Sequence, residues 1–282
     1  MRVTKAVITA ASRGQRSLPL HTLVDRDGQE KTALRLLLEE ALAAGIEGIA
    51  VIHAPGDAEA YTKAAGDLAG RMTLLEQTQA LGYGQALLCA RDFVAGESFL
   101  HLVGDHVWLS GTTQRCAAQL VARAQELRCS VSAVQATRET MLPYYGVVGG
   151  RRVAQTEDLY EVEELIEKPT PTQAEQQLLI PGLRAGHYLC FFGMHVLTPA
   201  VMDILARLVA TGTRVPLAAA LRELIGRERY VALQMRGTRY DLGTRYGLLQ
   251  TQLALALAGE NRDEVLAMLV EQLALRQQGL GN

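Results

Sequence analysis

The stretch ITAASRGQR, residues 8–16, overlaps the end of the apolar run KAVITA at residues 5–10. Small residues and a glycine follow a segment that reads as a buried strand, and an arginine closes the loop. In doubly wound α/β proteins, such strand-to-helix loops lie at the edge of the sheet where ligands bind. The stretch therefore predicts either a loop that holds phosphate or simply a tight connection between a strand and a helix.

The segments that follow repeat this strand, loop and helix unit. Residues 32–45, TALRLLLEEALAAG, are predicted to form a helix because Leu34, Leu37, Leu38, Ala41 and Leu42 fall on one face, and Gly45 stops it. Further strands are expected at 46–54, 72–77 and 98–109, with helices at 56–70 and 84–94 between them. This alternation favours a mostly parallel sheet with helices on both faces.

The second half of the chain has a different pattern. Residues 130–137 and 185–198 read as buried strands, and residues 144–169 as extended segments joined by a Gly-Gly turn, an antiparallel ribbon. From Thr244 onward, two helices with leucine stripes are expected, separated near Gly259. We therefore expect an α/β fold of the Rossmann-like, doubly wound class, with a mixed, mostly parallel sheet. Residues 1–243 would form the α/β domain, and residues 244–282 a C-terminal helical tail packed on it.

Composition limits the classes of function. The chain has 282 residues, of which 49% are hydrophobic, enough for a large core. A formal net charge of −2 provides no uniform basic field for nucleic acid or an anionic membrane. The four cysteines lack metal-ligand spacing and indicate free thiols in a reducing compartment. With no apolar run of signal-peptide or membrane-spanning type, a cytoplasmic protein is expected.

The opening loop fits neither of the two best-known phosphate-binding patterns. It has one glycine, whereas a dinucleotide loop needs GxGxxG and a P-loop needs GxxxxGK followed by Ser or Thr. It resembles instead the signature loop of the sugar-1-phosphate nucleotidylyltransferases, which usually reads A-A-G-x-G-T-R-x-x-P. The corresponding residues run from Ala10 to Pro19, and Ser12 stands where the first glycine is usual.

Five further segments resemble motifs of the same family and occur in the family's order. They are EQTQALGYGQA (76–86), LVGDHVW (102–108), YYGVV (144–148), LIEKP (165–169) and RYDLGTRYG (239–247). Each alone has a simpler explanation, such as a turn glycine, a capping aspartate or a solvated charge pair. Their order makes coincidence a poor explanation. The resemblance spans roughly residues 3 to 256 and is nearest to the bacterial UTP-glucose-1-phosphate uridylyltransferase type.

The resemblance implies a role for each matching residue. It implies nucleotide binding by Ala10, Ala11, Ser12, Gly14, Gln77 and Gly82. It implies sugar and phosphate binding, beside the antiparallel ribbon, by Gly146, Glu167 and Lys168. It implies catalysis by Arg16, Asp105, Lys168 and Asp241. Within these sets, Gln77 would read a uracil or thymine edge, and Asp105 and Asp241 would hold Mg²⁺.

The chemistry of this family explains why such residue types are useful. A sugar 1-phosphate attacks the α-phosphate of a nucleoside triphosphate, and a metal ion and cations offset the repulsion between the two polyanions. Carboxylates suit Mg²⁺, while Arg16 would stabilise the leaving pyrophosphate and Lys168 the incoming phosphate. The expected substrates are UTP, with dTTP left open, and glucose 1-phosphate or a related hexose phosphate. The leucine stripes of the tail predict a homo-oligomer.

Two departures from the family pattern leave alternatives open. The family usually has a P-K-x-x-L-P segment after the signature, but this chain has no lysine between Arg16 and Lys31, so Arg13, His21 or Lys31 are candidate substitutes. An acidic segment usual in the nearest relatives is represented only by TRVPLAAAL (213–221), which leaves the exact sugar open. A noncatalytic, nucleotide-sugar-binding regulatory relative is therefore the alternative. A glycosyltransferase is disfavoured because Gly104-Asp105-His106 lacks D-x-D.

Overall fold

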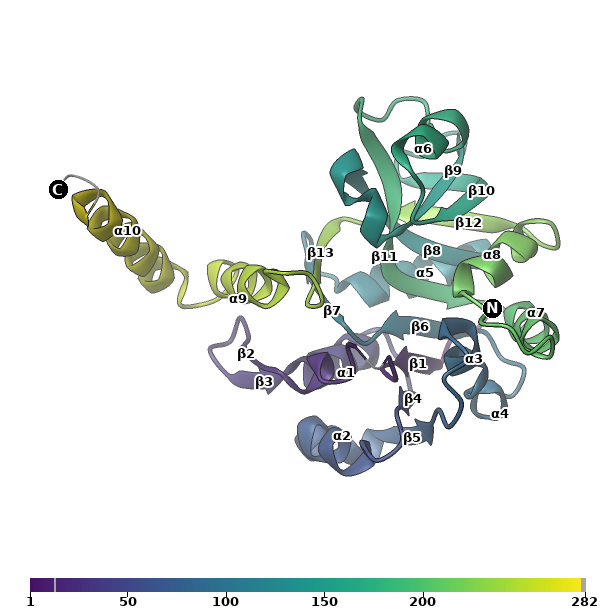
Figure 1. Cartoon of the computed structure of the whole chain (residues 1–282), viewed down its shortest axis with the longest axis horizontal. Helices are drawn as coiled ribbons and strands as arrows, with labels where there is room; N and C mark the ends of the chain where they lie inside the picture. The colour runs from purple at the N-terminus through teal and green to yellow at the C-terminus, as the bar shows by residue number, and fades with distance from the viewer. Residues whose placement is uncertain (13, 280–282) are drawn as a thin grey trace.

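A nine-stranded mixed sheet forms the centre of the computed structural model, which describes residues 1–12 and 14–279 (Figure 1). The strands lie in the order β5 (Met72–Glu76), β4 (Gly48–His53), β1 (Lys5–Thr9), β6 (Phe99–Val103), β11 (His187–Leu197), β8 (Ser130–Arg138), β12 (Tyr230–Gln234), β10 (Leu159–Glu167) and β9 (Gly146–Arg152). Strands β5, β4, β1 and β6 pair in parallel, as do β8 and β12. Strands β10 and β11 run opposite to the others. The predicted mixed α/β class is confirmed.

Helices cover both faces of this sheet. The core on one face includes residues of α1 (Ala33–Ala43), α2 (Ala58–Ala65) and α5 (Cys116–Leu127). The core on the other includes residues of α3 (Tyr83–Leu88), α4 (Arg91–Val94), α7 (Ala200–Val209) and α8 (Leu217–Ile225). Successive side chains of β1 alternate between the two cores, with Ile8 in the first and Val7 in the second. This two-sided burial explains why the strand is apolar almost throughout.

Local sequence signals set the ends of α1. The side chain of Thr32 accepts a hydrogen bond from the backbone N–H of Arg35, which caps the first turn. Gly45 follows the helix with a φ of +79°, in the left-handed region that glycine enters without steric cost. The helix predicted at 32–45 therefore exists, with its last regular residue at Ala43.

The strand predicted at 98–109 is in fact two strands, β6 and β7 (His106–Ser110). At Gly104 the chain passes so close to the end of β1 that a Cβ there would lie 2.7 Å from the carbonyl oxygen of Thr9. The N–H of Gly104 donates to that same oxygen at 2.9 Å. This bend ends β6 and leaves Asp105 at its carboxyl end.

The Gly-Gly pair also has a role different from the predicted turn. Gly149 and Gly150 lie inside β9, which pairs antiparallel with β10 across a register irregularity between Val162 and Glu164. A Cβ at Gly150 would come within 2.0 Å of the Glu161 carbonyl oxygen. The glycine is needed for close strand approach, and residues 153–158 form the connection instead.

Two short ribbons flank the main sheet. Strand β7 pairs antiparallel with β13 (Gly237–Asp241), and β2 (Thr22–Val24) pairs with β3 (Glu30–Thr32). Shorter elements complete the fold: α6 (Pro171–Gln177) and the 3-10 turns η1 (Leu18–Leu20), η2 (Gly66–Arg71) and η3 (Glu139–Tyr144). In the described part of the chain, every helix is too short or too polar to cross a membrane.

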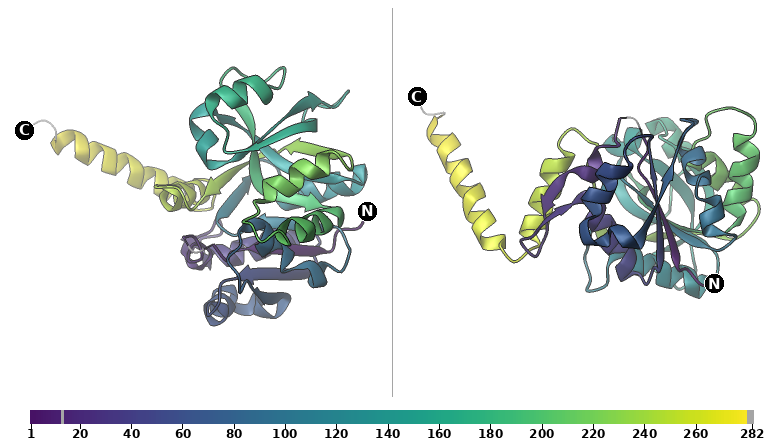
Figure 2. Two further views of the ribbon diagram at one scale, coloured as in Figure 1. Left: turned by 45° about the vertical axis from the view of Figure 1, so that its right-hand side comes forward. Right: turned by 90° about the horizontal axis from the view of Figure 1, so that it is seen from below.

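The two tail helices differ in how they pack. Helix α9 (Gly247–Leu257) buries Leu255 with Leu23 and Val107, and Gln252 bonds both backbone groups of Val24 in the β2–β3 ribbon. Helix α10 (Arg262–Gly279) instead extends away from the body (Figures 1 and 2). The expectation that both helices pack on the domain is therefore wrong for α10. Its apolar residues recur on several sides, so no single face directs it onto the body.

Candidate functional site

A cavity of about 790 Å³ opens where strands β1, β5 and β6 end. Most of the residues predicted for the site line it: Ala10, Ala11, Ser12, Gly14, Gln77, Gly82, Asp105, Gly146, Glu167, Lys168 and Asp241. Parallel strands place their carboxyl ends at one edge of a sheet, so segments far apart in sequence meet there. Arg16 is the predicted residue that does not line the cavity among those described.

Three side chains in this cavity form a group able to hold a metal ion. One ligand atom from each of Asp105, His106 and Asp241 lies within 4.8 Å of the others. The β7–β13 ribbon brings them together, because Asp241 pairs directly with His106 in its register. The N–H of Leu242 also donates to the Asp105 carbonyl oxygen at 2.9 Å. His106 was missed in the sequence, where it looks like an ordinary core or rim histidine.

The surroundings of Asp105 favour its ionised carboxylate. Burial raises the pKa of Asp105, but His106, 2.8 Å from it, and Lys168 outweigh that effect and hold the pKa below its ordinary value. The backbone N–H of Gly243 donates to Asp241 at 2.8 Å, which fixes that carboxylate. Both carboxylates are therefore anchored by hydrogen bonds.

Gln77 and Gly82 form another wall of the cavity. The side chain of Gln77 is nearly buried, and its amide nitrogen donates to the Gly82 carbonyl oxygen at 3.2 Å and to the side-chain oxygen of Gln85. Gly82 has a φ of +101°, and a Cβ there would lie 2.8 Å from Cγ of Arg214. The glycine thus permits both the backbone conformation and the close approach of a neighbouring side chain.

Gly146, Glu167 and Lys168 lie together on the sheet edge formed by β9 and β10. A Cβ at Gly146 would lie 2.9 Å from a carboxylate oxygen of Glu167, so the glycine makes room for that side chain. Burial raises the pKa of Glu167, and Lys168 partly offsets this. Lys168 has a φ of +50° and its N–H donates to the Tyr145 carbonyl oxygen at 3.1 Å. This left-handed conformation is uncommon for a lysine.

Arg16 lies outside the cavity and faces another residue. Its guanidinium is half exposed and lies 3.7 Å from the carboxylate of Asp57. The hydroxyl of buried Tyr61 lies 2.8 Å from the Arg16 carbonyl oxygen and 3.1 Å from that of Ala10, so its one proton is shared between the two parts of the signature loop. Arg13, the other arginine of this loop, lies outside the described residues.

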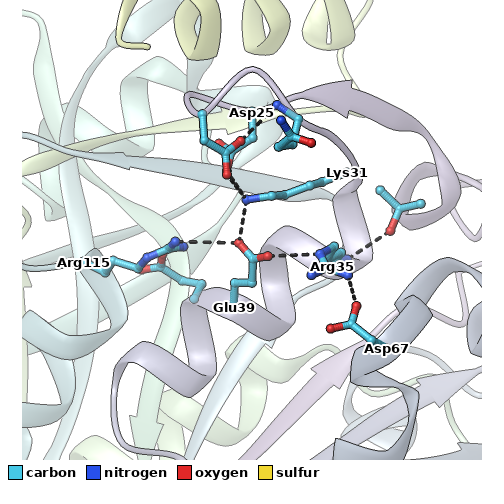
Figure 3. Close-up of polar contacts among 10 residues, drawn as sticks. Asp25, Lys31, Arg35, Glu39, Asp67 and Arg115 are labelled. Carbon is cyan, nitrogen blue, oxygen red and sulfur yellow. Dashed lines mark hydrogen bonds and ion pairs between the residues drawn. The ribbon is translucent and has the colours of Figure 1, made fainter. Parts of the chain in front are cut away.

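Lys31 does not replace the missing signature lysine in the cavity. Its ammonium is held by Asp25 and Asp27 at 2.8 Å and by Glu39 at 3.2 Å (Figure 3). Desolvation lowers the pKa of Lys31, but the three carboxylates more than offset this and raise it. Figure 3 shows that Glu39 also meets Arg35 and Arg115, so the cluster joins the β2–β3 ribbon to α1 and α5. His21 bonds the carbonyl oxygen of Ser17 and does not line the cavity.

Replacing Lys31 by methionine is expected to affect stability rather than turnover. The change leaves buried Asp25 and exposed Asp27 without their cation, whereas Glu39 keeps Arg35 and Arg115. Leaving a buried polar group such as Asp25 without its partner costs about 1–3 kcal/mol of the free energy of unfolding. Denaturant unfolding would measure this loss, with exposed Lys63→Met as the control. Combining Lys31→Met with Asp25→Asn should recover part of it. A Lys31→Met protein that unfolds normally yet loses turnover would instead make Lys31 a substrate ligand.

The chain was compared with known proteins once this geometry was established. A family model described as nucleotidyl transferase matches residues 5–256. The chain belongs to the nucleotidyl transferase family. The predicted family resemblance is confirmed, and the matched residues include every lining residue described above.

Individual proteins and solved structures similar to this nucleotidyl transferase are consistent with the family assignment. The chain is 28% identical to UTP-glucose-1-phosphate uridylyltransferase 1 of Streptococcus pyogenes serotype M3, over 91% of this chain and 90% of the relative. A uridylyltransferase of Streptococcus pneumoniae serotype 4 is also 28% identical, over 91% of each chain. A UDP-glucose pyrophosphorylase complexed with UDP-glucose shares the fold with a TM-score of 0.73 and 23% identity, covering 90% of this chain and 98% of that one. The enzyme from Acinetobacter baumannii also gives 0.73, at 22% identity, covering 96% and 100%.

Proposed function

We propose that this nucleotidyl transferase joins UTP to glucose 1-phosphate, releasing pyrophosphate and forming UDP-glucose. One observation carries the proposal: a single cavity places the paired carboxylates Asp105 and Asp241 and the cation Lys168 beside Gln77 and Gly82. The names of the uridylyltransferase relatives support the choice of substrates. A catalytic role fits this arrangement better than nucleotide-sugar sensing, because binding alone does not need the carboxylate group.

The carboxylate group fits a divalent cation, and we infer that Mg²⁺ occupies it. Asp105 and Asp241 offer the hard oxygen ligands that Mg²⁺ prefers, and their anchored carboxylates need little rearrangement to accept it. His106 would either complete the ligand set or orient Asp105 through its Nδ1. When bound, such an ion offsets the negative charge that develops on the phosphates.

Other residues of the chain would position the two substrates and offset the charge of their phosphates. Lys168 would hold the phosphate of the sugar substrate, and Glu167 beside Gly146 would accept hydrogen bonds from sugar hydroxyls. Ala10, Ala11, Ser12 and Gly14 would let the triphosphate approach the backbone, because their side chains are small. Arg16, exposed and paired only at 3.7 Å with Asp57, would turn toward the leaving pyrophosphate when nucleotide enters.

Measurement of pyrophosphate release over a grid of nucleoside triphosphates and sugar 1-phosphates tests the proposal. We expect UTP with glucose 1-phosphate to give the highest kcat/KM in the grid, and chelation of divalent cations to stop the reaction. If no pair of substrates in the grid releases pyrophosphate, yet the protein binds UDP-glucose measurably, the regulatory alternative is supported instead. We assign the reaction to the cytoplasm, because the four free cysteines fit a reducing compartment.

The orientation of Gln77 predicts the preferred base. Its amide nitrogen already donates to Gly82 and Gln85, so its oxygen is the atom left to face a base, as an acceptor. The N3–H of uracil can donate to that oxygen, whereas N3 of cytosine is an acceptor. UTP should therefore be preferred to CTP, and Gln77→Ala should weaken the preference by about 1–3 kcal/mol. Equal kcat/KM for UTP and CTP in the unmutated protein would contradict this reading.

The tail from residue 244 onward suggests assembly rather than catalysis, and we infer that α10 pairs with another copy of this chain. Its large apolar side chains are exposed: Leu266, Met268, Val270, Leu273 and Leu275, the most exposed being Leu273 at 66%. An isolated helix of this length is marginal in water unless it packs against something.

Truncation after Gly259 is therefore expected to lower the number of subunits in the particle, as measured by light scattering. The double change Val270→Glu with Leu273→Glu should act like the truncation, because a buried charge opposes helix pairing. Glu271→Ala on the same helix is the matched control. A truncated protein with the same number of subunits as the full chain would refute the assignment.

A further inference from the structure

The cavity has few cations for the two polyanionic substrates proposed for it. Among the described residues that line it, the lysines and arginines are Lys168 and Arg214. Lys31 is enclosed by its three carboxylates, and Arg16 faces Asp57. Three acidic side chains, Asp105, Glu167 and Asp241, line the same cavity. Arg214 is therefore a positive charge in the cavity, within the segment TRVPLAAAL (213–221) that replaces the family's usual acidic segment.

Backbone contacts hold Arg214 against the nucleotide side of the cavity. The N–H of Val215 donates to the Leu81 carbonyl oxygen at 3.3 Å, and the N–H of Gly84 donates back to Val215 at 2.9 Å. These two bonds lay the Arg214 segment across residues 81–84. Cγ of Arg214 lies 2.8 Å from the position of a Cβ on Gly82, so its aliphatic stem packs on that glycine.

The same segment also reaches the sugar side. Helix α8 begins at Leu217, directly after Arg214–Pro216, and Leu217, Ala218 and Leu221 line the cavity. One turn further, Nε of Arg222 donates to the Leu165 carbonyl oxygen at 3.0 Å. Leu165 belongs to β10, the strand that ends in Glu167, next to Lys168. Arg214 thus lies on a segment that connects the wall formed by Gln77 and Gly82 to the one that holds Glu167 and Lys168.

Arg214 lines the cavity, is exposed, and makes no ion pair with any described carboxylate. An arginine in this state can grip two oxygens of one phosphoryl group, which a lysine cannot. We propose that Arg214 binds a phosphoryl group of a substrate and thereby supplies the cation that the signature loop lacks. This assignment rests on the proposed function. Two substrates carry such a group, the nucleoside triphosphate and the sugar 1-phosphate.

Binding and kinetics of Arg214→Ala and Arg214→Lys test the assignment. Titration calorimetry with UTP, pyrophosphate and glucose 1-phosphate, each with Mg²⁺, gives affinities that do not depend on turnover. We expect Arg214→Ala to weaken at least one of these ligands about tenfold or more and to lower kcat/KM, with Arg214→Lys intermediate. Arg71→Ala, an exposed arginine outside the cavity, is the matched control and should change nothing.

The pattern of loss identifies the phosphoryl group. Weaker UTP and pyrophosphate with unchanged glucose 1-phosphate assigns Arg214 to the triphosphate, and the opposite pattern assigns it to the sugar phosphate. If the unmutated protein transfers no nucleotidyl group while Arg214→Ala still weakens a ligand, the proposed function fails and this assignment stands. Affinities and KM values all within twofold of the unmutated protein, or no binding of any probe by that protein, would overturn it.

Discussion

The Asp105→Asn and Asp241→Asn variants are each expected to lower kcat/KM by about 10³-fold or more, because a metal ion stabilises the charge of the transition state by several kcal/mol. Asp105 and Asp241 belong to a group whose ligand atoms lie within 4.8 Å of one another. Asparagine keeps the shape of each side chain but removes a full negative charge from the group. Mn²⁺ binding followed by electron paramagnetic resonance gives a readout separate from turnover and should weaken in both variants.

Two comparisons make this experiment specific. Asp203→Asn changes an exposed aspartate that pairs with Arg91 outside the cavity, and it should leave both turnover and metal binding unchanged. His106→Gln is expected to reduce turnover only about tenfold, since both carboxylates remain. A folded Asp241→Asn protein with near-normal turnover would remove that residue from the proposed metal site.

Loss of the Lys168 side chain is expected to lower kcat/KM by about 10²-fold, the usual effect of removing one preorganised charge donor. The expected cause is the loss of the ammonium facing the cavity, beside Glu167 and Asp105. The backbone conformation allows this cause to be isolated. At a φ of +50° glycine is favoured over alanine, so Lys168→Gly should be at least as stable as Lys168→Ala while losing as much activity.

Arg128 offers a matched control for this experiment. It is a cation in the same left-handed conformation, with a φ of +55°, at the end of α5 and outside the cavity. Arg128→Gly should reproduce the stability effect of Lys168→Gly without any change in turnover. A stable Lys168→Gly protein that retains the turnover of the unmutated chain would show that Lys168 does not contact the phosphate.

Much of the fold follows from local patterns in the sequence. The apolar runs at 5–10 and 46–54 form strands because they are buried on both faces, and the stripe of leucines after Thr32 forms α1. The exceptions arise where another segment comes close. Gly104 divides the single strand predicted at 98–109 because it lies against Thr9, and Gly150 stays inside a strand because it lies against Glu161. Such approaches are not visible in a pattern of hydrophobicity.

The amino-acid sequence by itself determined the class of fold and several segments of the cavity wall, because the signature loop and the segment EQTQALGYGQA (76–86) each follow a strand that local patterning already predicts. Only the tertiary structure decided which charged side chains line that cavity. Pairing of β7 with β13 brings His106 to Asp241. The hydrogen bonds of Val215 to Leu81 and Gly84 place the neighbouring Arg214 at the cavity. Because the β2–β3 ribbon packs on α1, Lys31 pairs with three carboxylates and does not line the cavity. A side chain's charge is written in the sequence, but its partner depends on distances between segments, and those are set by packing.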